Sequence, residues 1–379
     1  MAKLISQETN LLIYASSKES DMLYAARVFI TDPFFWFDAG KEQYIFLDDR
    51  EYEFFKQENT NARLTPLRLN ILDKETRKNK EKTSGANKLA FALFTLYQLW
   101  DKPVEVPAHF PLPMADYLRS KGALLAPRVP FFPERARKSK RELEEIKESI
   151  KKTQEAFAFI ESVLAKSAIQ GNRVIYNKRT LTSEWLKNEV EKLLFEKGMV
   201  CSEGMIISSG NDSAIPHHPG KGPILPHQPI VCDIFPHSKK SGYFADITRT
   251  YVKGTPSQRI LAMENAVKAA QKKAIAAVRP GSRGADIHEL CAFILVKHGF
   301  HAGAKGFIHA TGHGIGLDVH EEPSLGPNSR ALLEESNVVT VEPGLYYPSM
   351  GGIRIEDIVL VTKTGNHILT TPPKRFVIP

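Results

Sequence analysis

Four apolar segments in the second half of the chain each contain an isolated carboxylate, and this feature constrains the fold more than any other. Asp233 lies in PIVCDIFP, Asp246 in YFADITRTYV, Glu342 in NVVTVEPG and Glu356 in GGIRIEDIVLVT. The alternation of residues predicts four strands, each with its carboxylate on the same face as apolar neighbours. Burying a carboxylate in this way is costly unless a positive group compensates it. A lysine or arginine explains one such residue, whereas four together favour divalent cations.

Histidine is concentrated in the same half of the chain, since His109 is the only one of the 12 histidines before position 200. The segment FIHATGHGIGLDVHEEP holds His309, His313 and His320 among glycines, which allow close backbone approach to a site. Four carboxylates and one imidazole suit two hard or borderline divalent ions better than a thiolate-binding metal. Two ions about 3.5 to 4 Å apart can share a water and lower its pKa toward about 7. The pattern therefore predicts hydrolysis of an amide.

The composition is that of a folded protein: 42% of the 379 residues are hydrophobic and 25% are charged. The net charge of +8 is modest and does not by itself indicate nucleic acid. No apolar run approaches the roughly 18 residues of a membrane helix, so we expect no membrane partner. Gln7 and Glu8 interrupt the apolar core that a secretory signal needs, which predicts a cytoplasmic protein. Three widely spaced cysteines predict reduced thiols.

Two domains are expected from the change in pattern along the chain. In the N-terminal part, short apolar strands alternate with helical patterns, which predicts a small α/β domain. Residues 130–141 are rich in proline and then basic, which is typical of an exposed link. We place the boundary near Lys138, between domains 1–138 and 139–379. Four glutamates follow the basic run and argue against a nucleic-acid-binding arm.

The C-terminal domain is predicted to mix helices with the four strands in an α+β arrangement. Ser139 and Glu142 have the spacing of a capping box at the start of a long helix. Further helices are predicted over 182–197, 255–279 and 285–298, each bounded by capping or breaking residues.

The motifs and their order resemble those of the pita-bread metallopeptidases, the family of methionine aminopeptidase, aminopeptidase P and prolidase. They are an aspartate strand followed by ADITRT, GHGIGLDVHEEP, VEPGLYYP and GGIRIEDIVLV, and the similarity runs from about Ser139 to the C-terminus. The resemblance implies a pita-bread catalytic domain of the creatinase/aminopeptidase type, preceded by a small α/β creatinase-type N-terminal domain. It also implies two divalent metal ions, with manganese favoured and cobalt or zinc as alternatives.

The same resemblance implies a set of metal ligands. Asp233 would bind one ion, Asp246 and Glu356 would bridge both, and His313 and Glu342 would complete the other. Glu342 also resembles the family's proton carrier for the bridging water.

Four further residues resemble the family's active-site residues. His320 would steady the substrate and the tetrahedral intermediate, and His217 matches a further active-site histidine. His309 would line the site and Arg354 would help to anchor it. Alternatively, Arg354 is a charge partner that orients Glu356 or the adjacent aspartate, and both roles can hold together.

The residues in these motifs are more similar to those of prolidase and aminopeptidase P than to those of methionine aminopeptidase. This implies a peptide substrate with proline at its second position, cleaved after the N-terminal residue. The N-terminal domain would narrow the cleft and help to build a homodimer. The alternatives are a methionine aminopeptidase, a metal-free binding module on the same fold and a creatinase-type hydrolase. The complete ligand set argues against the last two.

Overall fold

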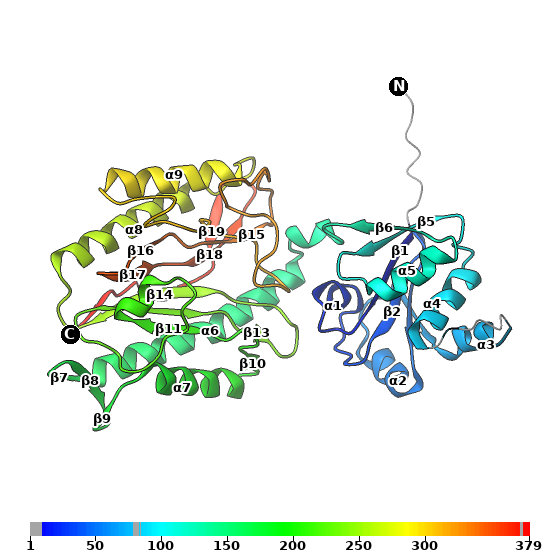
Figure 1. The fold of residues 1–379 in the computed structure, drawn as a ribbon, viewed down its shortest axis with the longest axis horizontal. Coiled ribbons are helices and arrows are strands. Elements are labelled where there is room, and N and C mark those ends of the chain that lie inside the picture. Colours follow the sequence, from blue (N-terminus) through cyan, green and yellow to red (C-terminus); the bar gives the residue numbers. More distant parts are fainter. Residues whose placement is uncertain (1–9, 79–82, 84, 372–373) are drawn as a thin grey trace. The chain divides into compact units, whose positions relative to one another are not determined.

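The computed structural model describes residues 10–78, 83, 85–371 and 374–379, and it divides into two compact units, Met1–Pro133 and Glu134–Pro379 (Figure 1). The division falls before Lys138. Phe131 and Phe132 are buried in the core of the first unit and Lys138 is buried in the second, so the segment is not the fully exposed link that we expected. Among the described residues, no helix combines the length and apolar character needed to cross a bilayer.

The first unit is built on a six-stranded mixed sheet with the order β4-β3-β2-β1-β5-β6. Its strands are β1 (Asn10–Ala15), β2 (Phe34–Asp38), β3 (Gln43–Leu47), β4 (Leu64–Arg68), β5 (Pro103–Pro107) and β6 (Leu124–Arg128). The pairs β1/β2 and β2/β3 are antiparallel, whereas β3/β4, β1/β5 and β5/β6 are parallel. The α/β character predicted for this part of the chain is present.

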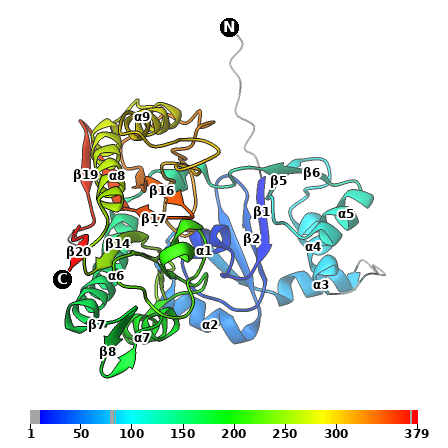
Figure 2. The same cartoon turned by 60° about the vertical axis from the view of Figure 1, so that its left-hand side comes forward.

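Helices cover both faces of this sheet (Figure 2). They are α1 (Ser20–Ala26), α2 (Asp49–Glu58), α3 (Asn70–Lys78), α4 (Gly85–Leu96) and α5 (Leu112–Ser120). Because neighbouring strand residues point to opposite faces, Phe35 and Phe37 pack with α3, α4 and α5, while Phe34 and Trp36 pack with α1 and α2. Each face therefore has its own apolar core.

Four long helices organise the second unit, together with two 3₁₀ turns. They are α6 (Lys140–Lys166), α7 (Ser183–Glu196), α8 (Gln258–Ala277) and α9 (Gly284–Lys297), with η1 (Pro133–Ala136) and η2 (Gly210–Ala214). Ser139 and Glu142 form the predicted capping box at the start of α6. The helix α8 begins later than expected, because Ser257 rather than Thr255 supplies the capping oxygen.

The strands of the second unit lie largely between α8 and α6, apart from a small three-stranded sheet beside α7 (Figure 1). They form sheets with the orders β11-β12-β14-β20, β15-β18-β19, β16-β17, β7-β8-β9 and β10-β13. Their bounds are β7 (Ala168–Gln170), β8 (Arg173–Tyr176), β9 (Arg179–Thr180), β10 (Met199–Val200), β11 (Ile206–Ser209), β12 (Pro229–Ile234), β13 (His237–Ser238), β14 (Ile247–Lys253), β15 (Val338–Val341), β16 (Gly344–Tyr347), β17 (Gly351–Arg354), β18 (Asp357–Val361), β19 (Asn366–Ile368) and β20 (Val377–Ile378).

The carboxylates do not all lie within strands, as the alternation had predicted. Asp233 is inside β12, but Asp246 directly precedes β14 and Glu342 directly follows β15. The single strand expected around Glu356 is broken after Arg354, because β17 pairs with β16 whereas β18 pairs with β15. Three carboxylates thus lie where the strands end, outside the regular ladders.

Candidate metal centre

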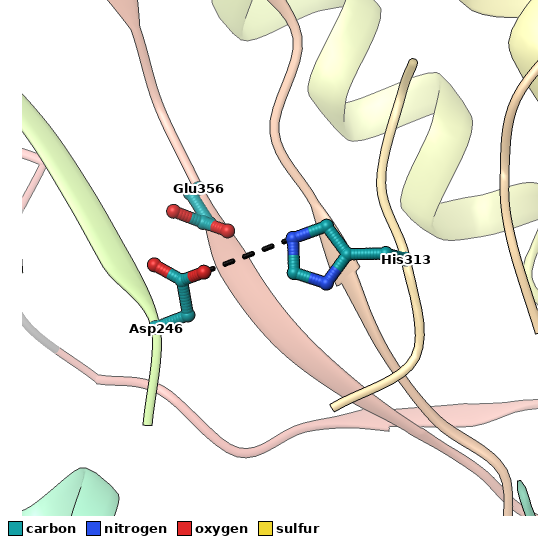
Figure 3. A group of neighbouring side chains, drawn as sticks. All are labelled: Asp246, His313 and Glu356. Carbon is teal, nitrogen blue, oxygen red and sulfur yellow. Dashed lines mark ion pairs between the residues drawn. The ribbon is translucent and has the colours of Figure 1, made fainter. Parts of the chain in front are cut away.

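Asp246, His313 and Glu356 meet in the second unit, and one ligand atom from each lies within 4.8 Å of the others (Figure 3). His313 Nε2 is 3.7 Å from Asp246 Oδ2 and 3.2 Å from Glu342 Oε1. His313 lies in an irregular segment that is bonded to β15: its N–H donates to Thr340 Oγ1, and its carbonyl accepts from the Thr340 N–H. The fold therefore brings this imidazole to three of the predicted carboxylates.

Asp233 joins the group through Thr248 of β14. Thr248 Oγ1 lies 2.8 Å from Asp233 Oδ1 and 2.8 Å from Glu356 Oε2. One hydroxyl proton cannot be donated to both carboxylates at once. Whichever carboxylate does not accept the Thr248 proton must itself be protonated or have a cation nearby.

Burial and mutual repulsion of the carboxylates shift their pKa values. Burial, with the charges of Glu356 and Asp233, raises the pKa of Asp246 well above its usual range. Burial and the charges of Glu342 and Asp233 raise the pKa of Glu356 to about 8. Burial also opposes ionisation of Glu342, but the hydrogen bond and charge of His313 lower its pKa to about 2. Without a cation, Asp246 and Glu356 favour their protonated forms.

Two carboxylate oxygens in this group, Asp246 Oδ1 and Glu356 Oε1, are buried without a hydrogen-bond partner among the described residues. Buried polar atoms are almost always satisfied, so these two oxygens point to a missing positive group. Asp246 is 5% exposed and Glu356 is 1% exposed. The convergence of four carboxylates and an imidazole fits divalent metal ions.

Arg354, at the end of β17, forms its ion pair with Asp233 rather than with Glu356 or Asp357, the partners expected in one of our two interpretations. Its Nη2 pairs with Asp233 Oδ2, and its Nε donates to Thr248 Oγ1. Arg249, which sequence reasoning did not single out, pairs with Asp357 at 2.8 Å and donates to the carbonyl of Glu356. In the sequence, Arg249 is visible only as the arginine of the ADITRT motif.

Tyr346 was also missed, and it links Arg354 to His309. The Arg354 Nη1 donates to the Tyr346 hydroxyl at 2.8 Å, and that hydroxyl lies 2.9 Å from His309 Nε2. His309 Nδ1 is 2.7 Å from the carbonyl of Ala310, which can only accept, so Nδ1 carries the proton and Nε2 accepts from Tyr346. Burial lowers the pKa of His309, in keeping with a neutral ring. VEPGLYYP contains this tyrosine, but the motif alone does not say which tyrosine faces inward.

His320 and His217 lie around the same group. The ring of His320 meets that of His313 edge-on, with centroids 4.2 Å apart. Burial, with the positive charge of His313, lowers the pKa of His320. His217 is exposed, and its charge also lowers the pKa values of His309 and His320.

The loop that carries His320 is held by cations from the start of the second unit. Arg135 Nη2 lies 2.7 Å from Asp318 Oδ2 and 2.6 Å from Glu321 Oε2, and Lys138 Nζ pairs with Glu321 Oε1. The Lys138 side chain is 2% exposed. We call Arg135, Lys138, Asp318 and Glu321 the loop clamp. The sequence does not reveal it, because a proline-rich and basic run is typical of an exposed link.

Comparison with known proteins identifies the family. Residues 144–363 match the model of metallopeptidase family M24. An uncharacterized peptidase of Bacillus subtilis, YqhT, is 34% identical over 242 residues, which cover 64% of this chain and 64% of that protein. The Xaa-Pro dipeptidase of Pyrococcus furiosus is 36% identical over 172 residues, 45% of this chain and 48% of that protein. The chain thus spans less than two thirds of the length of these curated relatives.

Solved structures establish the fold. The prolidase from Pyrococcus furiosus has a TM-score of 0.76 at 24% identity, over 96% of both chains. An Xaa-Pro dipeptidase from Bacillus anthracis has a TM-score of 0.79 at 24% identity, over 98% of this chain and 95% of that chain. The expected α+β fold, a pita-bread domain preceded by an N-terminal domain, is confirmed. With more than half of its length matched by the family model, the chain belongs to metallopeptidase family M24.

Proposed function

We propose that this chain is a peptidase that uses two divalent metal ions to cleave the bond between an N-terminal residue and proline. The observation that carries the proposal is the pair of buried oxygens of Asp246 and Glu356 that lack a hydrogen-bond partner among the described residues. They lie beside His313, which contacts Glu342, and Thr248 connects Glu356 to Asp233. The preference for proline is supported by relatives named Xaa-Pro dipeptidase, among them that of Pyrococcus furiosus.

The residues present would hold the ions in a defined way. Asp233 would bind one ion, His313 and Glu342 the other, and Asp246 and Glu356 both. When bound, such ions supply an activated hydroxide and polarise the scissile carbonyl. Arg354 holds the Asp233 carboxylate in place, because its guanidinium contacts Asp233 Oδ2 while both groups are buried.

The chain's own groups supply the remaining chemistry. Glu342, the carboxylate with the lowered pKa, is ionised and can take up the proton of the attacking water. His320 is neutral near pH 7 because its pKa is lowered, so it can donate one N–H to the developing oxyanion. The hydrogen bonds from Arg354 to Tyr346 and from Tyr346 to His309 fix the orientation of the His309 ring. His217, exposed beside these histidines, would face the substrate.

Several finer features belong to the same proposal. Manganese is the favoured ion, with cobalt or zinc as alternatives, because the donor set is dominated by oxygen. The N-terminal domain would limit substrate length and contribute to a homodimer. A cytoplasmic location agrees with three free cysteines, Cys201, Cys232 and Cys291. Light scattering on the purified chain would test the dimer.

The function is tested by metal analysis combined with a small peptide panel. The purified protein, supplied with Mn²⁺, Co²⁺ or Zn²⁺ in turn, is assayed on an Xaa-Pro dipeptide, a longer Xaa-Pro peptide and a Met-Ala peptide. We expect two ions per chain and a preference for the Xaa-Pro bond. A preference for Met-Ala would favour methionine aminopeptidase, and a protein that neither binds metal nor cleaves any peptide would refute the proposal.

A further inference from the structure

Gln271 is a polar residue in an apolar part of the second unit. It lies on the buried side of α8 with Val267, Ala270 and Ala274, and it is 1% exposed. Its neighbours belong to the largely aliphatic core beneath β15 and β17. An amide buried at such a position is unfavourable unless its hydrogen bonds are made, so its partners indicate its role.

Those partners are the backbone groups directly before two predicted ligands. Gln271 Nε2 donates to the carbonyl of Val341 at 3.1 Å and to the carbonyl of Ile355 at 3.0 Å. Val341 precedes Glu342, and Ile355 precedes Glu356. The Gln271 side chain therefore connects the backbone next to Glu342 with the backbone next to Glu356.

The orientation of the amide follows from its third partner. Lys374 Nζ donates to Gln271 Oε1 at 2.7 Å. Because an ammonium group only donates and a backbone carbonyl only accepts, the amide cannot be turned over without losing all three bonds. Lys374 also pairs with Asp357 at 2.5 Å. The backbone carbonyl before Glu356 and the side chain of the residue after it are thereby both connected to Gln271, the second through Lys374.

We propose that Gln271 is a positioning residue that sets the spacing between Glu342 and Glu356, and hence the affinity of the site for its ions. The inference rests on the proposed function. The β15–β18 ladder places Val341 opposite Asp357, next to the two glutamates. Gln271 adds a second connection, from the carbonyl of Val341 to that of Ile355, on the side of Glu356 that the ladder does not hold. A group that orients ligands from behind in this way typically changes metal affinity 10- to 100-fold when it is removed.

The test replaces Gln271 with methionine, which has a similar volume and no donor. The matched control is Ala274→Gly, one turn further along the same buried side of α8, which weakens the helix without removing a side-chain hydrogen bond. Mn²⁺ is titrated calorimetrically into each metal-free protein, and thermal unfolding of the same samples reports their stability. We expect Mn²⁺ to bind Gln271→Met at least about tenfold more weakly than wild type, with kcat/KM recovering at saturating Mn²⁺. Ala274→Gly should keep the wild-type Mn²⁺ affinity.

Equal Mn²⁺ affinity in Gln271→Met and Ala274→Gly would overturn the inference, because a residue that only stabilises the core would behave like the control. Should Gln271→Met not unfold cooperatively, Lys374→Met replaces it, since that side chain is 35% exposed and its loss frees the amide to turn. Weaker Mn²⁺ binding supports the inference there too, and unchanged binding overturns it. A wild-type protein that binds no Mn²⁺, Co²⁺ or Zn²⁺ would instead refute the proposed function itself.

Discussion

Replacing Glu356 with glutamine should have opposite effects on metal binding and on the stability of the metal-free protein. The pKa of Glu356 is raised from 4.5 to about 8, chiefly by burial, so the folded chain holds a proton that the unfolded chain releases. A raised pKa of this kind favours folding fully below about pH 4.5, and the benefit is lost as the pH rises toward 8. At pH 7 this penalty is about 3 kcal/mol, and at pH 5 it is below about 1 kcal/mol.

Glutamine has a similar shape and no charge to desolvate, so Glu356→Gln should recover most of that penalty. For a unit of this size, about 2 to 4 °C per kcal/mol predicts a rise in Tm of roughly 6 to 12 °C at pH 7 and little change at pH 5. The assay is thermal unfolding in the presence of a chelator from pH 5 to 8. Glu335→Gln is the matched control, because Glu335 is exposed. A variant that is no more stable than wild type at pH 7, or that still binds two ions, would refute the reasoning.

Three other substitutions distinguish the roles within the site. Asp246→Asn should lose metal and hydrolysis together in elemental analysis and peptide assay, because it removes a charge that we assign to both ions; retention of two ions and normal turnover would contradict the assignment. His320→Ala should lower kcat about 100-fold with unchanged metal content, since we assign the ring to the substrate and not to an ion; loss of metal would contradict that assignment. Tyr346→Phe should lower kcat/KM about tenfold, with a loss of about 1 to 3 kcal/mol in unfolding free energy, because it removes the hydroxyl between Arg354 and His309; an unchanged kcat/KM would exclude a positioning role.

Local patterns predicted the elements of the second unit well. The capping box at Ser139 was confirmed because its two hydrogen bonds involve residues three apart in sequence. Alternation identified the segments that carry Asp233 and Glu356, but not the places where the strands end. The break before Glu356 arises because β17 and β18 pair with different strands, which no local pattern encodes.

The supporting network of the site could not be predicted for a similar reason. Arg249 and Gln271 act through partners that are distant in sequence, such as the bond from Gln271 to Ile355. Tyr346 joins Arg354, in the same hairpin, to the more distant His309. In the sequence, Gln271 reads as an ordinary polar residue of a helix. The candidate ligands stand out in the sequence because carboxylates in apolar segments are unusual, whereas the groups that contact them are of common types.

The loop clamp has a practical consequence for dissecting the chain. A fragment beginning at Glu134 would keep both cations of the clamp, whereas one beginning at Ser139, where the sequence pattern suggests a clean start, would lack Arg135 and Lys138. Glu321 would then be a nearly buried anion without its two counterions, which should lower the free energy of unfolding by about 3 to 5 kcal/mol. Truncation before Ser139 would therefore destabilise the turn that bears His320. An inactive fragment of this kind would reflect the loss of Arg135 and Lys138, and it would not show that the N-terminal domain is needed for activity.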